Sequence, residues 1–205
     1  MSAFAAPIAE QIWDMKYRLK APDGTPVDAT IEDTWRRIAR ALAAVEADPA
    51  MRLNEGACDP SGRMWVASME NNLTPDLQPR NQEWARGRLF RIDGDRATAM
   101  SDAEFGIPNT MVWSPSRDRF YLGDSLRNTI WVWDYDDSSG EIANRRVHVS
   151  GGPGIPDGSC IDTEGYLWTA RFGAGRVIRY DPDGQPEREV LLPARNPTAT
   201  SFAGP

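Results

Sequence analysis

The chain has 205 residues, of which 40% are hydrophobic and 26% charged, a composition typical of a folded globular protein. Lys and Arg total 23 against 30 Asp and Glu, and there is no basic block, which argues against a nucleic-acid partner. The opening residues lack a signal-peptide pattern, and no run reaches the roughly 18 apolar residues of a membrane span. We therefore expect no membrane partner and a cytoplasmic location.

The first 50 residues are predicted to form an α-helical hairpin. From Thr30 onward, apolar residues recur at three- and four-residue spacing on one helix face: Ile31, Trp35, Ile38, Leu42 and Val45. Thr30 is a suitable N-cap with Asp33 three residues on, and Pro49 marks the end. A shorter helix is predicted over 8–20, and the turn-forming run 21–29 joins the two.

This helical segment resembles a particular family. The run PIAEQIWDMKYRLKAPDGTPVDATIEDTWRRIARALAAVE is similar to the N-terminus of adenosylcobalamin-dependent (class II) ribonucleotide reductases. It carries none of that family's radical-site or redox cysteines, so the resemblance implies no reductase activity. An ordinary amphipathic hairpin is the alternative. We expect residues 1–50 to form a segment separate from residues 51–205.

From residue 51 the pattern changes to strands and turns. A tight turn followed by an alternating aromatic strand occurs three times, as DPSGRMWVAS at 59–68, SPSRDRFYLGDS at 114–125 and DTEGYLWTAR at 162–171. A second strand and an acidic turn follow each, and a repeat of about 50 residues is typical of β-propeller blades. We predict a mainly β fold, with about three blades of an expected six after the helical hairpin. An unclosed ring leaves blade edges open, which predicts self-association.

Aligning the repeats places Asn54, Asn109 and Asp157 at one equivalent position, five residues before each turn phrase, with Thr198 as the match in an incomplete next repeat. Innermost strands line a propeller's channel, so we expect the three side chains to converge. Their oxygens are hard ligands that suit Ca²⁺, with Mg²⁺, Mn²⁺ or Zn²⁺ as alternatives. The competing interpretation is that these residues only cap strand starts.

The few histidines and cysteines limit which metal sites and catalytic groups the chain can form. His148 is the single histidine, which excludes multi-histidine metal sites. It lies in the alternating run VHVS, so it is either a strand histidine or the base of a Ser/His/Asp triad. Cys58 and Cys160 lie far apart without a CxxC pattern, and we predict buried free thiols rather than a zinc site or a disulfide.

Several phrases of the strand-rich part together resemble the regucalcin/gluconolactonase (senescence marker protein) family. They occur in order across residues 51–205 as RLNEGACDPSGRMWVASM, GRLFRID, GIPNTMVWSPSRDRFYLGDS, IWVWDYDDSSGEIANRRV, IPDGSCIDTEGYLWTARFGAGRVIRYDPDG and NPTATSFAGP. The resemblance implies a propeller with a divalent cation, usually Ca²⁺, at its axis. It also implies hydrolysis of sugar lactones or related esters.

The resemblance assigns roles to particular residues. Asn109 and Asp157 match two of the family's metal ligands, and Asp157 also matches the proposed base that activates water. Arg52 and Asn54 match the substrate-binding residues of an R-x-N-[DE]-G phrase. Asn72 stands where an acidic substrate contact is expected, which puts the choice of substrate in doubt.

The chain departs from the family pattern at its N-terminal side. The family's third metal ligand is a Glu in a phrase reading roughly E-G-P-x-W, and no such phrase precedes Arg52. Fewer carboxylates weaken Ca²⁺ binding, so we expect impaired activity. Three hypotheses follow: a Ca²⁺-dependent lactone hydrolase, a non-catalytic calcium-binding or interaction propeller fragment, and a recombined or truncated reading frame.

Overall fold

The computed structural model describes residues 7–16, 18, 20–21, 23–45, 48–74, 76, 78–80, 82, 85–93 and 96–202. The predicted helical hairpin is present as α1 (Pro7–Lys16) and α2 (Ile31–Val45). Thr30 and Asp33 form the expected capping box, because the Asp33 amide donates to Thr30 Oγ1 at 3.2 Å and the Thr30 amide donates to Asp33 Oδ2 at 2.9 Å. No helix in the described ranges has the length and apolar character needed to cross a membrane.

A buried polar chain joins the two helices. Trp13, which is 7% exposed, donates from Nε1 to Thr34 Oγ1 at 3.0 Å. Thr34 Oγ1 donates in turn to Asp28 Oδ2 at 2.7 Å, and Arg37 forms an ion pair with the same oxygen at 2.8 Å. The buried polar side chains of this hydrogen-bonded network between the helices therefore have partners.

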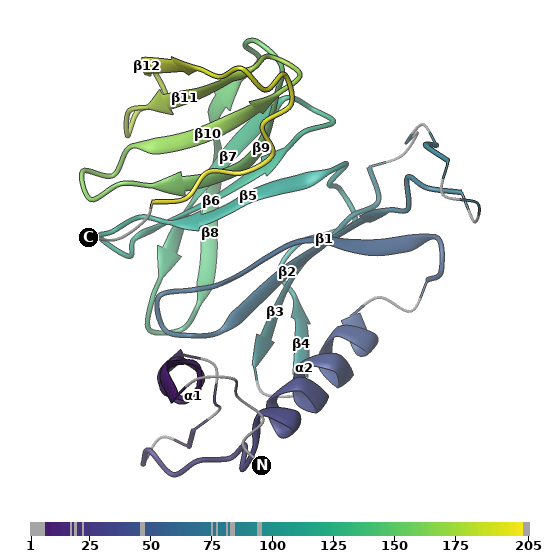
Figure 1. Cartoon of the computed structure of the whole chain (residues 1–205), viewed down its shortest axis with the longest axis vertical. Coiled ribbons are helices and arrows are strands. Elements are labelled where there is room, and N and C mark those ends of the chain that lie inside the picture. The colour runs from purple at the N-terminus through teal and green to yellow at the C-terminus, as the bar shows by residue number, and fades with distance from the viewer. Residues whose placement is uncertain are drawn as a thin grey trace.

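The strands of the described residues form three four-stranded antiparallel sheets, each built from consecutive strands (Figure 1). Blade one contains β1 (Met51–Cys58), β2 (Met64–Glu70), β3 (Leu89–Asp93) and β4 (Arg96–Ala99). Blade two contains β5 (Pro108–Trp113), β6 (Arg119–Asp124), β7 (Thr129–Asp136) and β8 (Glu141–Ser150). Blade three contains β9 (Ile155–Ile161), β10 (Leu167–Phe172), β11 (Arg176–Tyr180) and β12 (Pro186–Leu191). The mainly β fold predicted from the repeats is confirmed.

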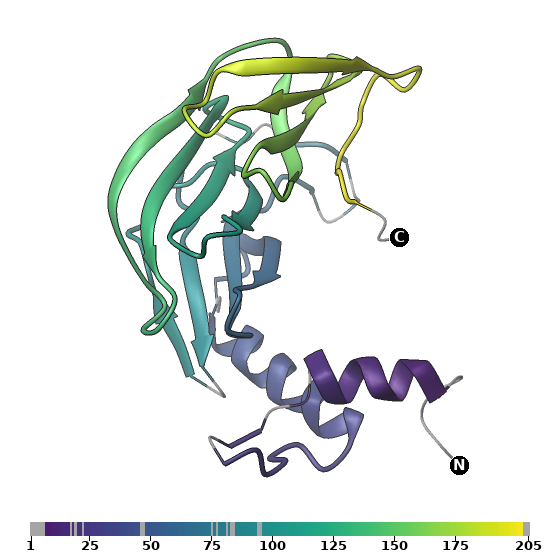
Figure 2. The same cartoon turned by 90° about the vertical axis from the view of Figure 1, so that its left-hand side faces the viewer.

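The first strands of neighbouring blades lie side by side. β5 contacts both β1 and β9, and the Gly158 amide in β9 donates to the Thr198 carbonyl at 2.8 Å. The segment around Thr198 thus follows β9 as a further inner strand would. Figure 2 shows the three sheets arranged around an open curve rather than a closed ring. This arrangement is a partial propeller.

Aromatic packing holds blade one against blade two. Trp65 is fully buried, with its ring centroid 5.3 Å from Phe120 and 5.8 Å from Trp113. Asp59 Oδ2 accepts hydrogen bonds from Trp65 Nε1 at 3.1 Å and from Tyr135 of blade two at 2.8 Å. The buried carboxylate is therefore satisfied from both blades. A separate apolar cluster joins blades two and three.

Helix α2 packs on the other face of blade one. Val45 is 8% exposed and clusters with Val66, Phe90 and Ile92. In contrast, Trp35 on α2 is 56% exposed. The end of α2 therefore covers part of a sheet face that a preceding blade would cover in a ring (Figure 1).

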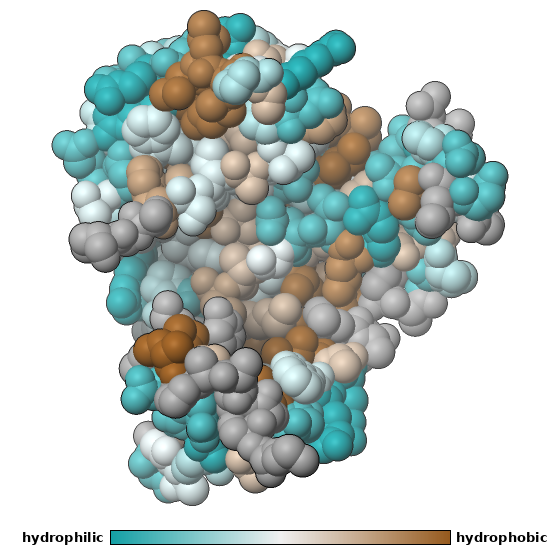
Figure 3. Space-filling view, in the orientation of Figure 1, coloured by the Kyte–Doolittle hydropathy of each residue, from teal (hydrophilic) through white to brown (hydrophobic). Residues whose placement is uncertain are grey.

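Other apolar surface remains exposed. Val190 and Leu191 on β12 are 40% and 73% exposed, and Ile8 on α1 is 60% exposed. Figure 3 shows apolar side chains at the surface both over the uppermost sheet and beside the helices. The predicted self-association through open blade edges stays a prediction.

The prediction that both cysteines are buried was wrong. Cys58 is exposed and Cys160 is half-buried, and neither is in a disulfide. Ala57 packs against the core between blades one and two, so the next side chain along the strand, Cys58, points to the opposite face. Strand alternation at this hairpin end outweighed the general preference of cysteine for burial.

Candidate metal and substrate site

The strand register confirms that Asn54, Asn109 and Asp157 occupy equivalent positions. Each lies on the first strand of its blade, where pairing with the second strand is irregular. Two residues further along, Gly56, Met111 and Ser159 pair with Val66, Leu122 and Thr169, whereas the unpaired residue is Asn54 itself in blade one and Thr110, next to Asn109, in blade two. A β-bulge at this position redirects the side chains relative to simple alternation, a frequent feature near binding sites.

A hydrogen-bonded chain joins three of the predicted residues across two blades. Arg52 Nη1 donates to Asn54 Oδ1 at 3.0 Å. Asn54 Nδ2 donates to Asn109 Oδ1 at 3.1 Å and to the Pro108 carbonyl at 2.9 Å. Asn109 Nδ2 donates to Ser125 Oγ at 2.8 Å. The structure therefore brings Asn54 and Asn109 into direct contact, and it orients both amides.

Arg52 also holds Asn72, the residue at the predicted position of an acidic substrate contact. Arg52 Nε and Nη2 lie 3.3 and 3.1 Å from Asn72 Oδ1. The guanidinium is therefore fixed between Asn72 and Asn54, on opposite ends of its planar fork. All three predicted substrate-binding residues form one cluster.

Asp157 lies on the adjacent inner strand. Its Oδ1 accepts the Gly158 amide at 3.0 Å, and no hydrogen bond to Oδ2 is formed within the described part of the chain. Thr110 of β5 donates to the Asp157 backbone carbonyl at 2.6 Å, which ties the two inner strands together. Burial raises the pKa of the Asp157 carboxyl, and the Gly158 amide only partly opposes this. Asp157 does not hydrogen-bond to Asn109 or Asn54.

Glu55 is a site residue that the sequence analysis did not single out. Burial raises the pKa of its carboxyl, the Gly56 and Thr110 backbone amides lower it, and the charge of Asp157 raises it. The carboxyl of Glu55 is therefore close enough to Asp157 to feel its charge. Strict strand alternation places Glu55 on the face opposite Asn54, and only the bulge between Leu53 and Glu55 changes this.

The donors available here suit a hard cation. No group of three or more His, Cys, Asp or Glu is gathered among the described residues. The carboxylates of Asp157 and Glu55 and the amide oxygen of Asn109 are nevertheless oxygen donors of the type Ca²⁺ prefers. A carbonyl oxygen has two lone pairs, so Asn109 Oδ1 can accept from Asn54 and still face an ion. The donor atoms therefore fit Ca²⁺ in kind. The site has only two carboxylates, and Ca²⁺ affinity rises with the number and charge of the ligands, so we expect weak binding.

His148 has the surroundings of a strand histidine. Its ring packs edge-on against Tyr121 at 5.0 Å, and its buried Nε2 has no hydrogen-bond partner in the described ranges. Burial, followed by the charge of Arg119, lowers its pKa to about 4. A Ser/His/Asp triad requires a histidine bonded to both partners, so this geometry does not support one.

Comparison with known proteins identifies the family of the chain. The family model described as the SMP-30/gluconolactonase/LRE-like region matches residues 27–205. The chain belongs to the SMP-30/gluconolactonase/LRE-like family. The match starts at residue 27, so it includes α2 as well as the three blades. The resemblance of residues 1–50 to ribonucleotide reductases rests on the sequence phrase alone.

Individual members of the SMP-30/gluconolactonase/LRE-like family resemble the chain over about half their own length. Regucalcin of Danio rerio is 35% identical over 175 residues, which cover 84% of this chain and 57% of the relative. The pentonolactonase of Haloferax volcanii is 32% identical over 160 residues, covering 77% of this chain and 51% of the relative. The crystal structure of the calcium-binding protein regucalcin from Agrobacterium tumefaciens superimposes with a TM-score of 0.68 at 30% identity, covering 78% of this chain and 52% of that one.

Proposed function

We propose that this chain hydrolyses sugar lactones or related esters at the inner-strand cluster, with Ca²⁺ as the cofactor and with activity impaired by the missing first-blade Glu. The observation that carries the proposal is the hydrogen-bonded chain from Arg52 through Asn54 to Asn109, with the Asp157 carboxyl on the next inner strand. The similarity to a pentonolactonase supports the same class of reaction.

The side chains of the cluster have three different roles in the proposed reaction. Arg52, held by Asn54, Asn72 and the Leu53 carbonyl, presents its remaining Nη2 N–H group to an oxygen of a lactone. Asp157, Asn109 and Asn54 would hold a Ca²⁺ ion, which would supply Lewis-acid polarisation of the carbonyl. Asp157, through the carboxylate oxygen that does not accept from Gly158, takes the proton of the attacking water.

The test is lactone hydrolysis by the full chain, followed as acid release, with chelator and then with excess Ca²⁺. Asp157→Asn is expected to lower the rate by roughly 100-fold or more, as is typical when a general base is removed. Asp183→Asn is the matched control, because Asp183 is an exposed turn carboxylate in blade three. A rate insensitive to chelator, or equal rates for the two variants, would refute the proposal.

A second function, calcium binding without turnover, is favoured by the composition of the site. No described acidic residue in the range 7–45 hydrogen-bonds or ion-pairs with Arg52, Asn54, Asn109 or Asp157. Glu46, which could stand in for the missing ligand, lies outside the described residues. Calorimetric Ca²⁺ binding that Asp157→Asn abolishes, together with no hydrolysis of any lactone tested, would establish this second function.

We also propose that the chain is a recombined or truncated reading frame; the resemblance of residues 1–50 to class II ribonucleotide reductases supports this, whereas the family match that begins at residue 27 counts against a join at residue 50. Such a recombined or truncated reading frame predicts parts of each parent beside the gene. Recovery of the intact 205-residue product from cells, together with the absence of any parental remnant, would contradict it.

A further inference from the structure

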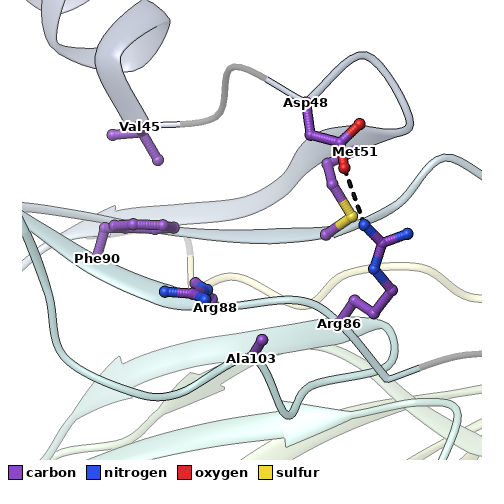
Figure 4. A pocket seen from close by; sticks show the side chains of 7 residues that line it. All are labelled: Val45, Asp48, Met51, Arg86, Arg88, Phe90 and Ala103. Atoms are coloured by element: carbon purple, nitrogen blue, oxygen red, sulfur yellow. Dashed lines mark hydrogen bonds and ion pairs between the residues drawn. The ribbon is translucent and has the colours of Figure 1, made fainter.

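A cavity lies away from the inner-strand cluster, where α2 ends and blade one begins. It has a volume of about 310 Å³ and is lined by Val45, Asp48, Met51, Arg86, Arg88, Phe90 and Ala103. Figure 4 shows Val45 and Phe90 at one end of it, and Arg86 reaching toward Asp48 and Met51 at the other. The cavity therefore has an apolar part and a charged part.

In the charged part, the described lining residues include more positive than negative side chains. Arg86 Nη2 forms an ion pair with Asp48 Oδ2 at 2.9 Å, and both side chains are partly exposed. Arg88 forms no hydrogen bond through its side chain and no ion pair in the described part of the chain, although it lines the same cavity. Among the described lining residues, two guanidinium groups face one carboxylate, a balance that favours an anion.

The backbone between the two arginines is fixed. The Gly87 amide donates to the Phe105 carbonyl at 2.7 Å, and the Ser68 amide donates to the Arg88 carbonyl at 2.9 Å. A Cβ on Gly87 would lie only 2.1 Å from the Ser68 carbonyl oxygen, so only glycine fits this close approach. Arg86 and Arg88 therefore project from a rigid segment, which lowers the conformational entropy lost when a ligand binds.

From this geometry we propose that the cavity binds a small organic carboxylate with an apolar body. The carboxylate pairs with the Arg88 guanidinium, which matches it in a two-point geometry, and Arg86 adds positive charge. The apolar body lies against Met51, Phe90 and Val45. This site is distinct from the inner-strand cluster, and its occupancy does not depend on lactone hydrolysis.

The test uses methyl NMR of the full chain labelled with ¹³C at its methionine methyl groups. Met51 lines the cavity and reports binding there, whereas Met111 is 5% exposed in the core and serves as the internal reference. Benzoate is the probe; benzyl alcohol supplies the same body without charge, and inorganic phosphate supplies charge without the body. Saturable shifts of the Met51 methyl with benzoate are expected, with binding of the other two at least about tenfold weaker.

Two arginine variants test whether the Arg88 guanidinium binds the carboxylate of benzoate. Arg88→Gln is expected to weaken benzoate binding by about tenfold or more, because one charge-assisted pair is lost. Arg96→Gln is the matched control, since Arg96 is an exposed residue of β4 in the same blade that does not line the cavity. The proposal is overturned if Met51 does not respond to benzoate, if phosphate binds as tightly as benzoate, or if Arg88→Gln and Arg96→Gln bind it equally.

Discussion

Tyr135→Phe tests the idea that one buried carboxylate couples blades one and two. The Tyr135 side chain is 6% exposed, and its hydroxyl donates to Asp59 Oδ2 at 2.8 Å while accepting from Arg63 Nη2 at 2.9 Å. Burial opposes the ionisation of Asp59, but hydrogen bonds from Arg63, Tyr135 and Trp65 outweigh it and lower its pKa. Removing the hydroxyl deletes both of these bonds without changing the ring, and Arg63 Nη2 keeps its bond to the Asp137 carbonyl at 2.6 Å.

The magnitude follows from what remains after the substitution. A hydrogen bond to a charged group contributes roughly 1.5–3 kcal/mol, and Asp59 keeps Arg63 Nε at 2.7 Å and Trp65 Nε1 at 3.1 Å. We therefore expect Tyr135→Phe to lower the free energy of unfolding by about 2 kcal/mol, measured by urea denaturation with circular dichroism.

Tyr180→Phe is the control for Tyr135→Phe. Tyr180 is also buried, at 3% exposed, but its hydroxyl forms no hydrogen bond among the described residues. Its substitution is expected to change the free energy of unfolding by less than about 0.5 kcal/mol. If the two variants are equally stable, the carboxylate network does not couple the blades and the reasoning is refuted.

Three further predictions follow from other parts of the structure. His148 has a folded pKa of about 4, below its ordinary value of 6.5, so its contribution to stability is present above pH 6.5 and is lost as the pH falls toward 4. In the parent protein this loss is at most about 3 kcal/mol of unfolding free energy. His148→Gln should remove this pH dependence from a plot of unfolding free energy against pH. Leu89→Ala empties a fully buried position between blades one and two and should cost about 2–5 kcal/mol in urea denaturation, whereas a cost under about 1 kcal/mol would mean the cluster repacks freely. Arg52→Lys cannot hold Asn54 and Asn72 together and should raise the KM for a lactone about tenfold with a smaller change in kcat; an unchanged KM would remove Arg52 from substrate binding.

The repeats made the main features of the site predictable. A constant five-residue offset from each turn identified Asn54, Asn109 and Asp157 as equivalent, and the strand register confirms this. The offset works because each blade reuses the same hairpin, so equal spacing along the chain becomes an equal position in space. Glu55 escaped prediction because a bulge breaks the alternation from which sequence patterns are interpreted.

For the helices, the sequence predicts the local structure but not the packing. The apolar stripe of α2 and its Thr30–Asp33 capping box were predictable, since both depend on residues within a few positions of each other. Which surface the stripe covers was not predictable. Val45 packs on blade one while Trp35 remains largely exposed, and no periodicity distinguishes these two members of one stripe.

Local patterns along the chain were enough to predict the two helices, the repeated hairpins, the number of blades present and the oxygen-rich side chains of each inner strand. The packing of the sheets was needed to show that Arg52, Asn54, Asn72 and Asn109 hydrogen-bond as one cluster, that Glu55 lies near Asp157, and that Arg86 and Arg88 share a cavity at the end of α2. The two groups of features differ in the sequence distance over which their interactions act. Helix periodicity, capping and turns depend on neighbours in the chain, whereas these clusters depend on how whole sheets and a helix pack, which is set by the sum of many weak, non-directional apolar contacts.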